Sequence, residues 1–221
     1  MRRIVFGCLA ILASGCAAAG CGGSSSNGVA SKSPSQILQT AIAAMKSAKS
    51  VHMAGTIIQA AKTIKVDMTI YSNGDVNGNF NENGPTVSII KIGPTDYIKT
   101  TSGFYQSQGS SAKIAGLMGG KWIEIPDSSV GLGSSFSLLG LANSITQNHK
   151  TVSAGKTSTV NGQPVVSIIA SNDGILYVAT TGTAYPVEVT KGSSGTITFT
   201  QWDLAKIPTA PAGARTPASF G

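Results

Sequence analysis

The sequence predicts an α+β protein in which a long antiparallel sheet is joined by few helices. Several segments alternate apolar and polar residues with a period of two, which is typical of strands. Only two segments show the 3.6-residue period of an amphipathic helix. Residue pairs that favour tight turns separate the alternating segments, as at Asn73-Gly74, Gly93-Pro94 and Asn161-Gly162.

The first expected element is a helix over residues 34–49. Ser33 can cap its N-terminus, Pro34 suits the first helical position, and Gln36 can complete a capping box. Apolar residues then recur at helical spacing, at Ile37, Leu38, Ala41, Ile42, Met45 and Ala48. We therefore expect this helix to bury one face.

From Val51 the chain changes to a period of two. Apolar residues 64, 66, 68 and 70 alternate with polar ones, which predicts a strand with one buried and one solvated face. Further strands are expected at residues 87–92, 96–100, 104–106 and 122–125.

Helical spacing returns in residues 136–148, and a short third helix is expected at residues 113–118. The last third of the chain alternates again, with strands expected at residues 152–160, 165–170, 175–180, 187–190 and 196–202. Residues 208–221 are rich in Pro, Ala, Gly and Thr, which predicts a disordered tail.

The N-terminus has the layout of a secretory signal peptide. Arg2 and Arg3 precede an apolar run that begins at Ile4, and small residues follow. The segment up to Ala19 is shorter than the roughly 20 residues that a membrane-spanning helix needs. A basic start, an apolar run and a Gly-Cys junction resemble the lipobox of bacterial lipoproteins, whose cysteine receives a diacylglycerol. An ordinary secreted protein cut after an alanine is the alternative.

Three cysteines compete for lipidation. Cys8 would leave too short an apolar run, whereas Cys16 and Cys21 both follow a glycine. The Gly/Ser-rich stretch after Cys21 is typical of a flexible tether and favours Cys21. We therefore expect a signal peptide over residues 1–20, a tether over residues 21–33, and one domain over residues 34–207.

Composition narrows the function further. Hydrophobic residues make up 41% of the chain and charged residues 11%, which suits a β-rich exported protein with a substantial core. The formal net charge is +7, but two of these charges belong to the signal peptide. The remaining lysines are scattered and Arg215 is the only arginine left, so we expect no nucleic-acid partner.

Residues that could carry catalysis or hold a metal are few and dispersed. His52 and His149 are far apart in the sequence, and no cysteine or carboxylate accompanies either at ligand spacing. The chain has no nucleophile elbow and no phosphate-binding loop, and Ser-x-x-Lys occurs only as isolated matches at Ser88, Ser110 and Ser153. The sequence therefore predicts neither an enzyme nor a cofactor or metal site.

Local phrases resemble a family of lipoproteins. "SPSQILQTAIAAMKSAKSVHMAGTI" resembles an opening helix and first strand, "DYIKTTSGFYQ" followed by "GKWIEIP" a central hairpin and strand, and "ILYVATTGTAYPVEVT" a late hairpin. Together residues 33–206 resemble the lipoprotein family of LppX, LprA, LprF and LprG and, more loosely, the LolA/RseB-like fold. The resemblance implies a curled antiparallel β half-barrel with helices packed on the concave face. Between sheet and helices it implies an apolar cavity for the acyl chains of lipids or glycolipids.

The leading hypothesis is a monomeric, membrane-anchored lipoprotein on the extracytoplasmic face that binds an amphiphile (a lipid, glycolipid or acyl chain) as carrier or sensor. One alternative is a partner-binding or regulatory cell-envelope lipoprotein with a packed core, and another is an enzyme with an unrecognised site. Candidate cavity residues from the strand and helix are Ile64, Val66, Met68, Ile70, Ile37, Ile42 and Met45. Their alternative role is ordinary core.

Entry of an apolar ligand requires a movable cover, and the glycine-rich segment 109–141 is the candidate lid. Its bulky apolar residues are Leu117, Met118, Phe136, Leu138 and Leu139. The alternative is a pair of glycine-rich loops that flank a packed helix.

Overall fold

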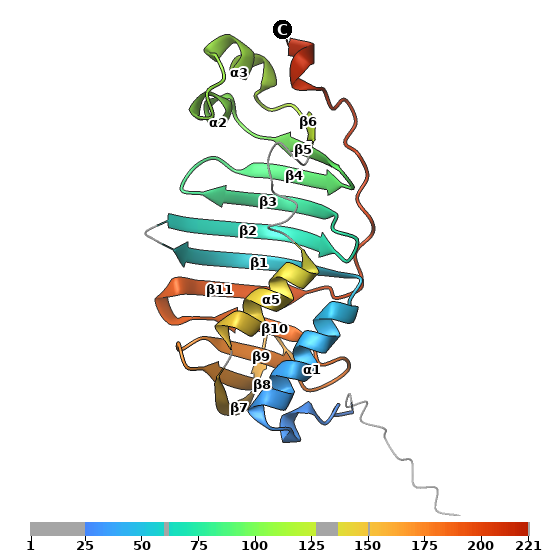
Figure 1. The fold of residues 1–221 in the computed structure, drawn as a ribbon, viewed down its shortest axis with the longest axis vertical. Coiled ribbons are helices and arrows are strands. Elements are labelled where there is room, and N and C mark those ends of the chain that lie inside the picture. Colours follow the sequence, from blue (N-terminus) through green and yellow to red (C-terminus); the bar gives the residue numbers. More distant parts are fainter. Residues whose placement is uncertain (1–24, 60–61, 127–136, 150, 221) are drawn as a thin grey trace, which may run out of the picture.

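The computed structural model describes residues 25–59, 62–126, 137–149 and 151–220. These residues form one antiparallel sheet of eleven strands in the order β6-β5-β4-β3-β2-β1-β11-β10-β9-β8-β7. The sheet curls but stays open, with β6 and β7 at its edges, and helices lie on one face (Figure 1). The prediction of an α+β half-barrel with helices on the concave face is confirmed.

The first six strands follow one another along the chain and form one meander. Each pairs with the next in antiparallel register. Their bounds are β1 Ser50–Gln59, β2 Lys62–Tyr71, β3 Val76–Glu82, β4 Val87–Ile92, β5 Thr95–Lys99 and β6 Ile123–Pro126.

The last five strands form a second meander. The turn between its first two strands has positive φ at both Asn161 and Gly162, the conformation that an Asn-Gly hairpin favours. The bounds are β7 Val152–Val160, β8 Gln163–Ala170, β9 Ile175–Ala179, β10 Pro186–Thr190 and β11 Gly195–Thr200.

The two meanders meet along one seam, where β1 pairs with β11. Two glycines lie on this seam because the backbones approach closely there. A Cβ built on Gly55 would overlap the carbonyl oxygen of Thr196, and a Cβ built on Gly195 would overlap that of Thr56. Side chains are therefore excluded at both positions.

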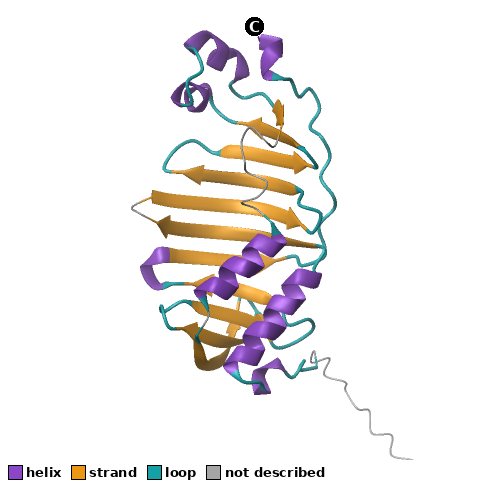
Figure 2. Ribbon diagram, in the orientation of Figure 1, coloured by secondary structure: helices purple, strands orange, loops and turns teal. Residues whose placement is uncertain are grey.

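The two longer helices, α1 (Pro34–Ser47) and α5 (Leu138–Asn148), lie side by side across the face that β1 and β7–β11 form (Figures 1 and 2). The predicted capping box is present in α1, where Ser33 Oγ accepts from the Gln36 amide at 3.4 Å and the Ser33 amide donates to Gln36 Oε1 at 3.1 Å. Among the described residues, no helix is long and apolar enough to cross a membrane.

Two short helices, α2 (Ser102–Ser107) and α3 (Ala112–Met118), lie at the β6 end of the sheet (Figure 2). The strand predicted at residues 104–106 is wrong, because these residues belong to α2. The side chain of Thr101 accepts a hydrogen bond from the Phe104 amide at 3.3 Å and so begins a helix. The sequence does not predict strand β3, because the asparagines and the glycine in it have low intrinsic strand propensity.

The C-terminal segment runs back along the sheet to its β6 end (Figure 1). The Arg215 amide donates to the Trp122 carbonyl at 3.1 Å, and the Glu124 amide donates to the Arg215 carbonyl at 2.8 Å. Phe220, in the short helix Pro217–Phe220, packs against the apolar cluster of α3. This segment, for which the sequence predicts disorder, therefore protects part of an edge strand from pairing with another chain.

Candidate functional site

The residues predicted to line a cavity lie together on the concave side. Five of them are buried in one hydrophobic cluster with α1 and α5: Ile37, Met45, Val66, Met68 and Ile70. Ile42 and Ile64 are partly buried and pack against that cluster. Met45 and Met68 are 0% exposed, so this part of the concave side is filled by side chains. Contact of these residues with a ligand stays a prediction.

A first cavity, the α2–α3 cavity, lies between strands β3–β6 and helices α2 and α3. Its volume is about 720 Å³, within the range of roughly 300–1,000 Å³ of small-molecule sites. Residues that pair directly across neighbouring strands point to the same face of the sheet. Phe80 pairs with Val87, and Ile98 pairs with Ile123, so these side chains share a face with their partners. The apolar lining includes Phe80, Val87, Ile98, Met118, Ile123 and Ile125.

Tyr105 is a polar group in the wall of the α2–α3 cavity. Its hydroxyl donates a long hydrogen bond to the Ile98 carbonyl at 3.5 Å, and burial raises the pKa of Tyr105 to about 12. Tyr105 therefore stays neutral at physiological pH, which suits a cavity for uncharged, apolar groups.

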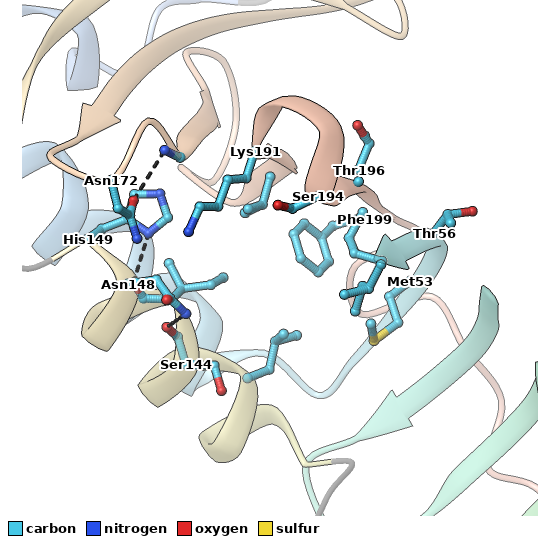
Figure 3. Close-up of a pocket in the computed structure, with 17 residues that line it drawn as sticks. Met53, Thr56, Ser144, Asn148, His149, Asn172, Lys191, Ser194, Thr196 and Phe199 are labelled. Atoms are coloured by element: carbon cyan, nitrogen blue, oxygen red, sulfur yellow. Dashed lines mark hydrogen bonds between the residues drawn. The ribbon is translucent and has the colours of Figure 1, made fainter. Parts of the chain in front are cut away.

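A second cavity, the α5 cavity, lies between α5 and strands β1, β10 and β11, and has a volume of about 260 Å³ (Figure 3). Most of its walls are apolar: Met53, Ile57, Leu141, Ile145, Val189 and Phe199. Polar side chains gather at the end opposite Met53, where Asn148, His149 and Lys191 lie near one another (Figure 3). The α5 cavity thus has mostly apolar walls, with its nitrogen-bearing side chains at one end. The hydroxyl side chains Thr56, Ser194 and Thr196 lie on the side toward Met53 (Figure 3).

His149 lies directly after the last residue of α5 and is 2% exposed. Its Nδ1 is 2.9 Å from the Ile145 carbonyl oxygen, which can only accept, so Nδ1 carries the hydrogen and donates it. Burial lowers the pKa of His149, although the hydrogen bond to Ile145 opposes this change. The neutral ring therefore presents Nε2 as an acceptor.

No protein-family model and no curated protein matches this chain. In three dimensions it is similar to LprF from Mycobacterium bovis, with a TM-score of 0.53 and 17% identity over 85% of this chain and 99% of LprF. The fold is that of LprF. The resemblance to the LppX, LprA, LprF and LprG family is therefore confirmed at the level of fold. MucB of Pseudomonas aeruginosa, solved with MucA, aligns over 85% of this chain and 60% of its own, with a TM-score of 0.32 and 12% identity.

Within this LprF-like fold the candidate lid residues are dispersed. Met118 lines the α2–α3 cavity, and Leu117, on the same helix, is exposed. Leu138 is buried in the main cluster, whereas Leu139 is 59% exposed. Phe136 lies outside the described residues, as do Cys21 and Cys16.

Buried charges on the concave side of the LprF-like sheet lie opposite each other. Lys91 on β4 pairs in register with Asp96 on β5, and both side chains are buried. Lys91 Nζ also donates to the Gly93 carbonyl at 2.6 Å. Opposite charges held in one register suit a structural pair. Across the described ranges, no group of three or more His, Cys, Asp or Glu could hold a metal ion.

Sequence reasoning did not identify the walls of the α5 cavity. Met53 and Phe199 fall in segments recognised as alternating, but their position opposite α5 depends on the seam that joins β1 to β11. The sequence assigns no role to His149, which has no metal-ligating residue at suitable spacing. A histidine next to the last turn of an amphipathic helix was the available signal.

Proposed function

We propose that this protein is a membrane-anchored lipoprotein of the cell envelope that binds an amphiphile on the concave face of its sheet, as carrier or sensor. The observation that carries the proposal is the α2–α3 cavity, an apolar space of about 720 Å³ between the sheet and two short helices. Packed interiors contain few voids larger than a water molecule. A space of this size with apolar walls suits an acyl chain better than water.

The energetics favour such a ligand. Burial of each CH₂ group contributes about 0.8 kcal/mol, so a chain of ordinary length gains several kcal/mol in a dry cavity. The walls include aliphatic side chains such as Val87 and Ile125, and Tyr105 is held neutral. Glu82, the charged residue of the lining, is exposed and paired with Lys62, so the aliphatic part of the cavity requires no charge on the ligand.

Anchoring to the membrane completes the proposal. The acyl groups would be attached at Cys21, and the Gly/Ser-rich tether would separate the membrane from the domain. A single acyl chain binds membranes only marginally, whereas two or more give stable anchoring. Labelled palmitate is expected in the wild-type protein and not in Cys21→Ala. Retained label in Cys21→Ala would move the assignment to Cys16.

Ligand binding is tested by native purification of tagless protein, extraction with organic solvent and mass spectrometry of the extract. We expect acyl lipids at a defined ratio to protein in the wild type. Ile125→Phe, which extends a side chain into the α2–α3 cavity, should lower that ratio while the fold survives. An extract without lipid above that of a control exported protein would reject amphiphile binding and leave a partner-binding lipoprotein as the better hypothesis.

A further inference from the structure

The polar end of the α5 cavity contains a hydrogen-bond acceptor that the described part of the chain does not use. His149 lines this cavity and is 2% exposed. Its Nδ1–H is engaged by the Ile145 carbonyl, so Nε2 must act as an acceptor. Nε2 is buried and receives no hydrogen bond from any described residue. Buried polar atoms are nearly always satisfied, so a donor other than the described residues is expected here.

The structural role of His149 does not explain this nitrogen. The Nδ1–H of His149 satisfies the Ile145 carbonyl at the C-terminus of α5. Packing of the ring depends on the shape of the ring and does not need an acceptor at Nε2. Space next to Nε2 is kept by Gly174, which lines the same cavity and has no side chain. A Cβ built on Gly174 would lie 3.5 Å from Nε2 but only 3.1 Å from Asn172 Oδ1. A ligand group therefore reaches the nitrogen when the exposed side chain of Asn172 shifts by a few tenths of an ångström.

The remainder of the α5 cavity indicates what is attached to that donor. Ile145 and Leu141 line the cavity one and two turns before His149 on α5. Phe199 lies on the side of the cavity toward Met53 (Figure 3). Lys191 lies beside His149 at the polar end, and within the described residues it forms no ion pair. Its ammonium can only donate, so it suits a ligand oxygen that accepts. The cavity therefore matches an apolar chain with an O–H group next to an accepting oxygen.

We propose that the α5 cavity binds the hydroxyl-bearing end of an acyl-chain amphiphile, with the hydroxyl donating to His149 Nε2 and Lys191 contacting a neighbouring ligand oxygen. This inference rests on the proposed amphiphile binding and specifies its ligand class. A polar end that only accepts, such as an ether, would face the lone pair of Nε2 and bind less tightly. Fatty alcohols and mono- or diglycerides carry the required hydroxyl, and the glycerides also supply the neighbouring ester oxygen.

The experiment compares ligands that differ in one donor. Delipidated protein is loaded with a fluorescent fatty acid, which is displaced by 1-dodecanol or by dodecyl methyl ether. A second pair, 1,2-dioctanoylglycerol and its 3-O-methyl ether, supplies a single hydroxyl from a glyceride headgroup. We expect each hydroxyl ligand to bind about tenfold more tightly than its methylated partner, since an unpaired buried acceptor is costly. If the hydroxyl ligand binds more tightly in only one of the two pairs, that pair identifies the source of hydroxyl that the cavity accepts.

Two substitutions of similar size separate the roles of the two ring nitrogens. His149→Asn can retain a donor near the Ile145 carbonyl but has no atom at the position of Nε2. His149→Gln reaches further and can place an acceptor there. The hydroxyl preference should fall to about twofold or less in His149→Asn and persist in His149→Gln. His52→Asn, at the other histidine, should leave the preference unchanged.

The α2–α3 cavity can bind the same ligands, so displacement alone does not show which cavity is occupied. Binding at His149 is therefore also measured directly in the wild-type protein by NMR. The ¹⁵N resonance of His149 Nε2 should shift when 1-dodecanol binds and stay in place when the ether binds. An unchanged resonance with both ligands, or a preference that survives in His149→Asn, would overturn the inference and leave amphiphile binding intact. Failure of every ligand to displace the fluorescent fatty acid would instead reject the proposed function itself.

Discussion

The two halves of the concave face are covered differently. Over β1 and β7–β11 lie α1, with 14 residues, and α5, with 11 residues. Over β3–β6 lie α2, with 6 residues, and α3, with 7 residues. The first half contains most of the filled core, whereas the second half borders the larger cavity, of about 720 Å³. The half with the longer helices therefore contains most of the buried apolar cluster, although it borders the α5 cavity as well.

Small residues contribute to the filled half. Ala41 on α1 and Ala142 on α5 are both 0% exposed, which is consistent with a close approach of the two helices to their neighbours. At the α2–α3 cavity the bulky residues Tyr105 and Met118 pack with Ile123 of β6 in a small buried cluster and also line the cavity. The comparison teaches that the same strand pattern can support a packed core or a cavity, depending on what covers it.

The largest expected effect separates the two halves. Gly55→Val places a side chain where the Thr196 carbonyl lies and should break the seam between β1 and β11. We expect a loss of more than about 3 kcal/mol in the free energy of unfolding, measured by urea denaturation, because backbone cannot move aside as a flexible side chain does.

Gly116→Ala serves as the control for this substitution. Gly116 lies within α3 and a Cβ there meets no atom within 4 Å, so alanine should be neutral or stabilise the protein by up to about 1 kcal/mol. Equal stability of Gly55→Val and the wild type would show that the seam does not hold the halves together.

A substitution that enlarges a side chain should distinguish a filled half from a hollow one. Met68→Trp overfills the main cluster and should cost about 1–3 kcal/mol of stability. Ile125→Phe extends into the α2–α3 cavity and should cost less than about 1 kcal/mol while lowering uptake of a fluorescent fatty acid. The comparison fails if Met68→Trp is tolerated and lowers uptake more than Ile125→Phe does.

Hydrogen exchange should show the same asymmetry without any mutation. Amides of α2 and α3 should exchange about tenfold faster than those of α1 in delipidated protein, because short helices have few amides in complete turns. Bound lipid should slow exchange in α2 and α3 if this region is the movable cover. If the amides of α2 and α3 are already well protected without ligand and bound lipid does not change this, the region is a fixed part of the fold and not a movable cover. A disulfide that ties Gly119 to a neighbouring strand should then leave uptake unchanged.

The smallest expected effect concerns pH and the half that contains α5. Burial lowers the pKa of His149 below 6.5, its usual value, so the unfolded chain binds more protons in the pH range just below 6.5. The contribution of His149 to stability is therefore complete above pH 6.5 and declines as pH falls through that range. Thermal unfolding at pH 7.5 and pH 5.5 should show a smaller decline in His149→Asn than in the wild type. An identical decline would place the responsible groups elsewhere.

Much of the fold could be predicted because its signals are local. Helix α1 carries its own capping box, and the Asn161-Gly162 turn has the backbone that its sequence favours. The residues of α2 resemble a strand by composition, and a single cap at Thr101 changes the outcome. Whether such a segment becomes a helix or a strand depends on its position in the three-dimensional structure.

The sites could be predicted less well because cavities depend on contacts distant in sequence. Met68 and Met45 lie in the main buried cluster, and no local pattern distinguishes a side chain that fills a core from one that borders a hollow. The acceptor on His149 is defined by Ile145, one turn away, and by Gly174, in the turn between β8 and β9. Only the assembled sheet brings these groups to one cavity.

The seam between β1 and β11 also determines when the sheet can be completed. Every other pair of neighbours in the described sheet is consecutive in the chain, so each meander can form as soon as its own strands are available. Strand β1 has to wait for β11, the last strand of the chain, and closing so long a loop is slow. Until then β1 presents an open edge that can pair with another molecule. A folding chain is therefore most exposed to aggregation while β1 is available for pairing and β11 is not.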